Sequence, residues 1–397
     1  MKRLLVIAAG YLQTFLIKKA KALGYHVIAI DGNPNAIGFR FADESACIDI
    51  TDPEACIRYA SSKHINGVVT AASDYGVISA GETAKALKLP GLNPEVARLI
   101  KNKFLVRKCL FQKRVDDTQQ AYQVDETTDI CKISKTLVFP VMVKPCDGSG
   151  SRGASRVDCR DELAPAIKYA IDGSLTHRAI IESFITGQEY GVESFVYDGE
   201  VHILGVMKKW MTVAPYYAEL GHAIPSGLST VLEAKVRNCV TSAIKALGVN
   251  FGSVNMDLLI TADCKVHIVD VGARMGGNLI GSHIIPMGTG VDYMGAIIQA
   301  AMGDKVNLKG TEVSNVATKL LALTPGRVVS LPNFESLEKT CDVKIEHHLS
   351  VGDEITSYRT NLDGCGYIIA TGESAAEAEC KAAKALALLD KTIQRAK

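Results

Sequence analysis

The first hundred residues alternate between short apolar runs and segments with helical periodicity. Leu4–Ala9 is an unbroken apolar run, which is typical of a strand covered on both faces. Apolar residues then recur on one helical face from Leu12 to Leu23, and Tyr25–Ile30 returns as a second strand. Further strands are predicted at Ala46–Ile50 and Gly67–Ala71, with helices around residues 54–61 and 77–87. This alternation predicts an open α/β domain with a mostly parallel sheet.

The pattern changes after residue 100. A polar-capped helix is predicted from Asn102 towards Leu110, and a longer amphipathic helix at about 231–247. Residues 213–229, after the only tryptophan, are expected to form an irregular loop. The last part of the chain predicts a small α+β unit, with strands around Lys319–Leu323, Val343–His348 and Tyr367–Thr371 and a final Ala-rich helix at Ser374–Ile393.

Composition narrows the classes of function. At 397 residues the chain is too long for one ordinary core, so two or three domains are expected. Its 44 Lys and Arg against 43 Asp and Glu argue against a nucleic acid bound through a bulk basic field. The 11 cysteines contain no C-x-x-C pair, which favours a reduced, cytoplasmic protein. No apolar run reaches the roughly 20 residues that span a bilayer, so we expect no membrane partner.

The stretch from Phe139 to Val157 is the first that points to chemistry. An apolar strand ends in Lys144, a loop of small residues follows, and a second strand opens at Arg156. Glycines let backbone N–H groups approach an anion closely, and Lys144 would add a positive charge, so the hairpin would cover a phosphate. The spacing matches neither the P-loop nor the Rossmann fingerprint. Taken alone, the loop is better explained as an exposed Gly/Ser hairpin, and the downstream residues decide between the two interpretations.

Several polar residues have two interpretations. Asp74 follows a strand at the edge where open α/β sheets bind ligands, but it would serve equally as the N-cap of the next helix. Lys103 is a candidate phosphate contact, and the alternative is a solvated helical lysine. Glu219 and His222 are the polar features of the expected loop at 213–229, between two segments with functional patterns.

Carboxylates interrupt the later strands. Glu182 ends one strand and Glu189 opens the next, where backbone groups would bind adenine and a carboxylate would hold a ribose. Asp257 and Asp270 each interrupt an apolar strand, and two carboxylates on adjacent strands can share Mg²⁺. Arg274 follows among tight turns, where it could stabilise oxyanions. The alternative is a pair of salt-bridged aspartates and a structural arginine.

In this order, the motifs resemble those of the ATP-grasp superfamily of ATP-dependent carboxylate–amine ligases. The matching segments are Asn102-Lys103, Val143–Pro145, Asp147–Ala154, Ile181–Phe184, Glu189–Glu193, Asp257 and Asp270–Gly277. The resemblance covers essentially the whole chain, and the run Gly272–Asn278 is more similar to the L-amino-acid ligases than to the purine enzymes.

The resemblance implies a fold with α/β and α+β parts. Residues 1–100 would form an open α/β (Rossmann-like) pre-ATP-grasp domain. Residues 101–310 would form the ATP-grasp domain of two subdomains, with a glycine-rich hairpin lid at about 137–190. Residues 311–397 would form a small α+β cap.

The resemblance also implies residue roles. Arg274 and Lys144 would be the catalytic cations, and Asp257 and Asp270 would bind Mg²⁺, with Mn²⁺ as an alternative. The residues implied to contact ATP are Lys103, Lys144, Ser149, Gly150, Ser151, Arg152, Gly153, Ala154, Glu182, Ser183, Phe184, Ile185 and Glu189. Those expected at the substrates are Asp74, Glu219, His222 and Asn278. The chain departs from the family where aspartates replace the usual glutamates. Gly272 also replaces the usual asparagine, so water or substrate would supply one metal ligand.

The expected reaction is amide formation between a small carboxylate and an amine, through an acyl phosphate, with release of ADP and phosphate. The alternatives within the family are a purine-biosynthetic or carbamoyl-phosphate-synthase-like ligase. From other classes, a non-catalytic nucleotide-binding module with a degenerate metal site remains open. So does an NAD-dependent oxidoreductase built on residues 1–100, although the glycine spacing there is poor. An isologous homodimer is the default assembly.

Overall fold

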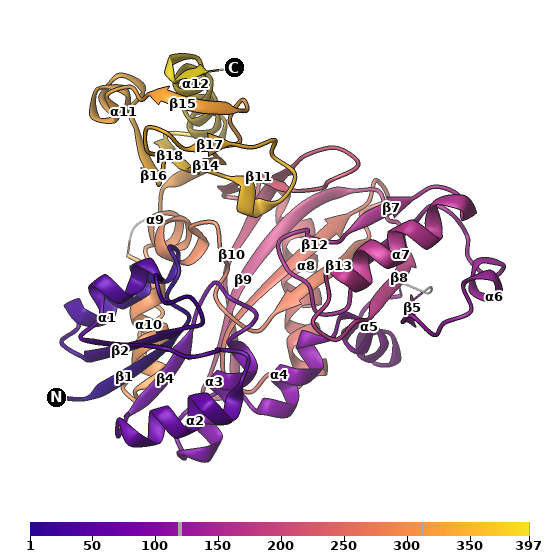
Figure 1. The fold of residues 1–397 in the computed structure, drawn as a ribbon, viewed down its shortest axis with the longest axis horizontal. Coiled ribbons are helices and arrows are strands. Elements are labelled where there is room, and N and C mark those ends of the chain that lie inside the picture. The colour runs from indigo at the N-terminus through magenta and orange to yellow at the C-terminus, as the bar shows by residue number, and fades with distance from the viewer. Residues whose placement is uncertain (118–120, 312, 397) are drawn as a thin grey trace.

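The computed structural model describes residues 1–117, 121–311 and 313–396. An N-terminal domain, a lid subdomain and a C-terminal segment surround one large central sheet (Figure 1). Within the described ranges, no helix is both long and apolar enough to cross a membrane. This arrangement agrees with the α/β and α+β parts expected from the sequence.

The N-terminal domain is a parallel sheet with strand order β3-β2-β1-β4. Its strands are β1 (Arg3–Ile7), β2 (His26–Asp31), β3 (Glu44–Cys47) and β4 (Gly67–Thr70), and its helices are α1 (Gln13–Ala22), η1 (Ile37–Phe41), α2 (Pro53–Ser62) and α3 (Val77–Ala86). Leu4 and Leu5 of β1 pack into cores on opposite faces, as expected for a strand covered on both sides. The strand predicted at Ala46–Ile50 begins earlier, because β3 pairs with β2 from Glu44 onward.

The central sheet has eight strands in the order β13-β12-β9-β10-β11-β14-β18-β16. The strands are β9 (Gln188–Tyr197), β10 (Glu200–Met211), β11 (Glu219–Ile224), β12 (Gly252–Ile260), β13 (Val266–Gly272), β14 (Asn315–Leu320), β16 (Val343–His347) and β18 (Gly366–Gly372). Alternation along β12 decides which side chains reach the site. Val254, Met256 and Leu258 are buried in the core shared with the helix over that face, so the intervening positions face the other way.

The prediction of an irregular loop over residues 213–229 was wrong for its middle part. Residues 219–224 form β11, which pairs with β10 on one side and β14 on the other. The strand escaped detection because its polar residues do not face bulk solvent: His222 is buried, and Glu219 is partly buried at the cavity, where it contacts Lys209 and Asn278. The loop region therefore contributes a rigid element to the sheet.

The lid subdomain is a separate sheet with the order β5-β8-β6-β7. Its elements are β5 (Ala121–Val124), α6 (Ile130–Ser134), β6 (Val141–Pro145), β7 (Ser155–Val157), η2 (Arg160–Glu162), α7 (Leu163–Asp172) and β8 (Ala179–Ser183). β6 and β7 pair antiparallel with Val141 opposite Val157, which confirms the strand–loop–strand prediction. The sheet starts with β5, earlier in the chain than the glycine-rich hairpin itself.

The remaining helices connect these sheets. They are α4 (Pro94–Lys101), α5 (Lys103–Gln112), α8 (Thr230–Ala246), the π-helical turn η3 (Ile280–Ile284), α9 (Ile285–Thr289) and α10 (Tyr293–Ala301). Asn102 caps α5, because its side chain accepts hydrogen bonds from the backbone N–H groups of residues 104 and 105. Val236 and Val240 of α8 pack on the apolar face of β12.

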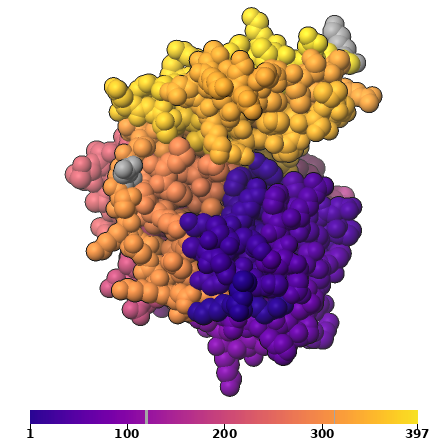
Figure 2. All heavy atoms as spheres, turned by 90° about the vertical axis from the view of Figure 1, so that its left-hand side faces the viewer, coloured from indigo at the N-terminus to yellow at the C-terminus, as the bar shows by residue number. Residues whose placement is uncertain are grey.

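The C-terminal segment adds strands to the central sheet and a small sheet of its own. Its further elements are β15 (Gly326–Ser330), α11 (Phe334–Cys341), β17 (Glu354–Ile355), η4 (Asn361–Asp363), α12 (Ala375–Thr392) and β19 (Gln394–Ala396). It lies against the N-terminal domain, as Figure 2 shows, and the Tyr11 hydroxyl donates a hydrogen bond to Glu346 at 3.4 Å across that contact. The C-terminal segment is thus anchored to both neighbours.

The junction of β11 with β14 gives a test of this arrangement. A Cβ at Gly221 would lie 2.1 Å from the carbonyl oxygen of Thr318 on β14, which no real contact allows. We expect Gly221→Ala to lower the free energy of unfolding by about 1–3 kcal/mol. Urea denaturation measures this change.

The matched control is Gly32→Ala, where the nearest atom lies 3.9 Å from the added Cβ. It should stay within about 0.5 kcal/mol of the parent protein. Equal stability of the two variants would contradict the close β11–β14 pairing.

Candidate functional site

One large cavity lies between the lid sheet and the central sheet, with a volume of about 820 Å³. The loop after β4, the lid hairpin, and strands β9, β10, β12 and β13 all contribute to its wall. Its size falls within the roughly 300–1,000 Å³ of small-molecule sites. The cavity brings together most of the residues that the sequence singles out.

The lid hairpin needs its glycines for steric reasons. A Cβ at Gly148 or Gly153 would come within 2.9 or 2.7 Å of Pro145, and Gly153 also has a φ of +71°. Asp147 holds the base of the loop, because its buried carboxylate accepts hydrogen bonds from the Ser174 hydroxyl at 2.7 Å and the Thr176 N–H at 3.0 Å. The hairpin is therefore a shaped cover with an anchored base.

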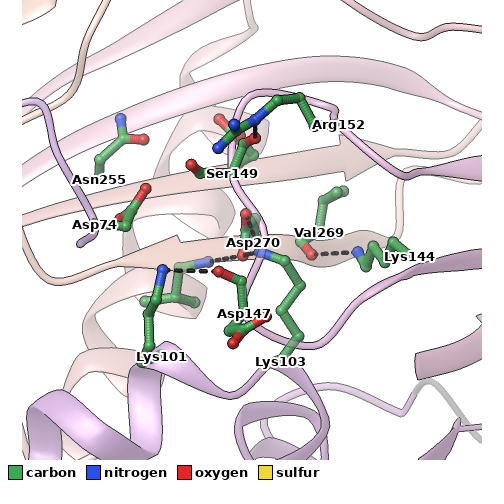
Figure 3. A network of polar contacts seen from close by, with 12 residues as sticks. Asp74, Lys101, Lys103, Lys144, Asp147, Ser149, Arg152, Asn255, Val269 and Asp270 are labelled. Atoms are coloured by element: carbon green, nitrogen blue, oxygen red, sulfur yellow. Dashed lines mark hydrogen bonds and ion pairs between the residues drawn. The ribbon is translucent and has the colours of Figure 1, made fainter. Parts of the chain in front are cut away.

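Lysines gather beneath this cover (Figure 3). Lys103 contacts both carboxylate oxygens of Asp270 at 2.5 Å, and Lys144 donates to the carbonyl oxygen of Val269 at 3.2 Å. Lys101 donates to the backbone oxygen of Asp147 at 2.7 Å. Lys103 is largely buried at this contact, so the prediction of a solvated helical lysine was wrong.

Arg107 completes the wall of the cavity and was not identified from the sequence. It is 5 % exposed, and its Nε donates to Glu182 at 2.9 Å while Lys144 contacts the other oxygen of that carboxylate at 2.6 Å. Burial raises the pKa of Glu182, but the two cations outweigh burial and the pKa is lowered overall. Each oxygen of the Glu182 carboxylate thus forms an ion pair with a cation. An adenine contact by residues 182–185 would consequently use backbone groups.

Lys209 lies at the centre of a second charged cluster. It is 1 % exposed, and its Nζ lies 2.8 Å from Glu219, 2.8 Å from Asp257 and 3.8 Å from Glu189. Burial alone would lower the pKa of Lys209, but the surrounding carboxylates raise it well above its ordinary value. Burial raises the pKa of Glu189 to about 7. The sequence offers one weak signal for this cluster. Lys209 follows the apolar Met207 by two positions on β10, which places both side chains on the same face of the strand.

Asp257 and Asp270 face each other across β12 and β13, as the sequence predicts. A bulge follows this pair, because Leu258 is opposite Ile268 and Val269 is left as the extra residue. The carbonyl oxygen of Val269 then accepts hydrogen bonds from Lys144 and from Arg107, both at 3.2 Å. The bulge thus links the carboxylate pair to the lysine end of the cavity.

Asp74 and Arg274 form a bidentate ion pair between the N-terminal domain and the loop after β13. Nε and Nη2 of Arg274 each lie 3.0 Å from one carboxylate oxygen of Asp74. The alternative role of Asp74 as a helix N-cap was wrong, since Gly76 occupies the N-cap position of α3. Burial opposes the charge of Asp74, but Arg274 holds its pKa below the usual range. The guanidinium is thereby fixed at the cavity wall.

The other expected substrate residues lie on β11 and in the loop after β13. Asn278 lines the cavity and donates a hydrogen bond to Glu219, and its amide oxygen accepts one from Tyr367 at 3.1 Å. His222 lies behind Glu219, with Nε2 at 3.7 Å from that carboxylate. It is 1 % exposed, and burial lowers its pKa to about 4. His222 therefore supports Glu219 as a neutral ring in this geometry.

A second group of potential metal ligands lies outside this cluster. Among the described residues, Asp116, Asp117 and His267 form a group of carboxylate and imidazole atoms close enough to share an ion. Asp116, however, already accepts a hydrogen bond from the backbone N–H of Ile268 at 2.8 Å and lies 3.6 Å from Arg107. Its carboxylate thus has a structural use.

Comparison with known protein families matches two segments of the chain. A model of the ATP-grasp domain matches residues 137–282, and a model of the L-amino acid ligase C-terminal domain 2 matches residues 319–394. The chain thus combines an ATP-grasp domain with an L-amino acid ligase C-terminal domain, the pair of domains found in ATP-grasp carboxylate–amine ligases. The ATP-grasp match spans the lid hairpin, both aspartates and Arg274, and the second match covers the segment that holds Asn278 through Tyr367.

Curated relatives of this ligase are distant. The uncharacterized protein y4rH of Sinorhizobium fredii is 25% identical over 394 residues, covering 95% of the chain and 80% of that protein. The ATP-grasp enzyme fsqD of Aspergillus fumigatus is 26% identical over 292 residues, covering 65% of the chain and 50% of that enzyme. The chain thus spans half the length of the second relative.

Two solved structures share the fold. The L-amino acid ligase from Bacillus licheniformis superposes with a TM-score of 0.83 at 23% identity, with 97% of each chain covered. The phosphoribosylglycinamide synthetase from Anaerococcus prevotii has a TM-score of 0.76 at 24% identity and covers 100% of this chain and 99% of its own. The ligase fold therefore extends over all parts of the molecule.

Removing the central cation should unbalance the second cluster. In Lys209→Met, three desolvated carboxylates would face one another without a counter-charge, and we expect a loss of about 3–5 kcal/mol in the free energy of unfolding. Chemical denaturation monitored by circular dichroism measures this loss.

Lys208→Met is the matched control, because Lys208 neighbours Lys209 on β10 but is less buried. Lys208 is partly exposed and lies 5.3 Å from the centre of the Trp210 ring, so its loss should change stability by about 1 kcal/mol or less. Similar losses for both variants would show that Lys209 does not neutralise the cluster.

Proposed function

We propose that this ligase uses ATP and Mg²⁺ to join the carboxyl group of an L-amino acid to an amine, through an acyl phosphate, with release of ADP and phosphate. The observation that carries the proposal is a single cavity whose wall combines lysines beneath a glycine-rich cover with Arg274 and the carboxylate of Glu219. The match of the C-terminal segment to L-amino acid ligases supports an amino acid as substrate.

The nucleotide would occupy the end beneath the lid. Lys103 and Lys144 would contact its phosphates, and residues 149–154 would close over them with backbone N–H groups. In the structure, Lys103 forms an ion pair with Asp270 and Lys144 forms one with Glu182. These ion pairs fix the positions of both ammonium groups. Backbone groups of residues 182–185 would bind the adenine, and Glu189 would accept hydrogen bonds from the ribose hydroxyls.

Two residues of the cavity wall fit a magnesium ion. Asp257 and Asp270 present carboxylate oxygens from paired strands, which is the hard donor type that Mg²⁺ prefers. Bound MgATP would supply the phosphoryl group that activates the carboxylate. Arg274, fixed by Asp74, would hold the negative charge that develops on the substrate and the transferred phosphoryl oxygens.

The cavity wall carries charges of both signs. Arg274 suits a carboxylate, whereas Glu219 stays ionised because Lys209 outweighs the effect of burial and its pKa is lowered to about 2. A zwitterionic amino acid has the complementary pair of groups. Asn278 would orient Glu219, and Tyr367 of the C-terminal segment holds Asn278 in turn. These contacts favour an amino acid over a simple carboxylate.

Hydroxylamine trapping tests this function. The purified chain is incubated with MgATP, hydroxylamine and each L-amino acid singly, and hydroxamate and ADP are measured. At least one amino acid should give both products, and amine substrates are then screened by mass spectrometry of the amide. If nucleotide binds while no carboxylate gives ADP or hydroxamate, the chain is a non-catalytic nucleotide-binding protein.

Lys144→Met tests the phosphate end. We expect the rate of ADP formation to fall about 100-fold or more, because one fixed cation is lost where charge develops. The fold should persist, since Arg107 still contacts Glu182. Lys168→Met on α7 is the control within the same subdomain, because Lys168 is exposed and pairs only with Asp172 of its own helix turn in the contacts described. A full rate for Lys144→Met would contradict its role.

Asp74→Asn tests the orientation of Arg274. An amide oxygen cannot accept both N–H groups of the guanidinium in the bidentate geometry, so the arginine would lose its fixed position. We expect kcat to fall about 10- to 100-fold with little change in the KM for ATP. A rise in the KM for ATP at unchanged kcat would place Asp74 at the nucleotide instead.

A further inference from the structure

The position where related ligases have a metal-binding asparagine holds Gly272 in this chain. The structure places Asn255 directly opposite it. In the pairing of β12 with β13, Asp257 faces Asp270 and Asn255 faces Gly272. The chain therefore has an amide on the neighbouring strand, one register step from both carboxylates.

The side chain of Asn255 lies on the same face as the carboxylates. On β12, Val254, Met256 and Leu258 are fully buried in the core beneath α8, whereas Asn255 and Asp257 are partly exposed at the cavity. Residues two apart on a strand point to the same side. Three oxygen-bearing side chains thus gather on one side of a two-stranded ladder.

A small recess separates these side chains. It has a volume of about 40 Å³. Its polar wall consists of Asn255, the carboxylates of Asp74, Asp257 and Asp270, and the cations of Lys101, Lys103 and Arg274. The three positive charges would be offset by the nucleotide phosphates that accompany the ion. One water-sized probe needs about 10–15 Å³ of such volume, so the recess has room for an ion with a bound water. In Figure 3, Asn255 lies beside Asp74, on the opposite side of Asp270 from Lys144.

The ion pair of Asp74 with Arg274 explains why residue 272 is a glycine. A Cβ at this position would lie 3.0 Å from Cζ of Arg274 and 3.1 Å from Oδ1 of Asp74. An asparagine side chain at 272 would have to enter the space of the guanidinium. Any side chain at 272 would therefore crowd the bidentate pair, which would have to shift by a few tenths of an ångström.

The orientation of the Asn255 amide suits metal binding. Its Nδ2 donates to Glu193 at 3.0 Å, and Glu193 is itself held by the Tyr293 hydroxyl at 2.6 Å and the backbone N–H of Gly276 at 3.0 Å. Oδ1 points the other way and accepts a long hydrogen bond from Nη1 of Arg274 at 3.4 Å. In metal binding, the amide oxygen would exchange this long contact for a bond to the ion.

We propose that Asn255 is a magnesium ligand of this enzyme, together with Asp257 and Asp270, and that it replaces the ligand absent at Gly272. The proposal rests on the proposed function, because the ion would be the one that accompanies ATP. Lys209 contacts Oδ1 of Asp257, and a carboxylate has a second oxygen that can bind an ion at the same time. Lys103 contacts both oxygens of Asp270 in the structure, so it would move to the ATP phosphates when Asp270 binds the ion. The donor set of two carboxylates and an amide is one that Mg²⁺ and Mn²⁺ accept.

Manganese binding in the presence of ADP tests this assignment without turnover. Free Mn²⁺ is measured by electron paramagnetic resonance while the full chain with excess ADP is titrated. We expect Asn255→Ala to weaken Mn²⁺ binding about tenfold or more, since even residues that only orient ligands change metal affinity about 10- to 100-fold. ADP affinity without metal should stay unchanged.

Asn255→Asp separates a ligand role from a structural one. An aspartate keeps an oxygen donor but cannot donate a hydrogen bond to Glu193. If Asn255 is a ligand, Asn255→Asp retains Mn²⁺ binding within a few-fold of the parent; if it only holds Glu193, Asn255→Asp binds Mn²⁺ as poorly as Asn255→Ala. The exposed Asn307→Ala is the control and should leave Mn²⁺ binding unchanged.

The outcomes are distinguishable. Parental Mn²⁺ affinity in a folded Asn255→Ala would overturn the ligand assignment and leave the ligase function standing. Failure of the parent chain to bind Mn²⁺ with ADP would overturn both. If circular dichroism shows that Asn255→Ala is unfolded, the Asn255→Asp variant decides between the two roles.

Discussion

The site depends on neutralising carboxylates that are removed from water. Several acidic side chains converge on one cavity, and in a desolvated space they would repel one another or bind protons. Lys209 balances three of them, Arg107 and Lys144 share Glu182, and Arg274 holds Asp74. The cations are therefore as much a part of the site as the acidic groups, and the cavity keeps its shape and charge before any ligand arrives.

These charge contacts also join distant parts of the chain. Asp74 and Arg274 are 200 positions apart, and Arg107 and Glu182 are 75 apart. The first pair connects the N-terminal domain to the strand that carries Asp270, and the second connects α5 to the lid. Assembly of the cavity thus requires that all the sheets come together.

The sequence predicts the local features of this molecule well. The parallel N-terminal sheet, the lid hairpin and the pairing of Asp257 with Asp270 follow from apolar periodicity and spacing, because neighbouring residues determine them. The sequence does not predict interactions between residues that are far apart in the chain. Lys209 and Arg107 look like ordinary basic residues until their carboxylates are known, and β11 looks like a loop although its polar side chains do not face bulk solvent. A charged residue usually indicates a solvent-exposed position, but a charged residue in a buried ion pair lies in the interior. Only the tertiary structure shows where this happens.

The eight-stranded sheet has a mechanical consequence. It runs without interruption from β13, which carries Asp270, to β16 in the C-terminal segment, whereas the four lid strands form a sheet of their own. Hydrogen-bonded strands resist relative movement, so we expect the aspartate pair, Glu219 and the C-terminal strands to move as one rigid body. If the lid moves to admit ligands, the distance between Asp270 and Glu219, both on the central sheet, is expected to stay constant.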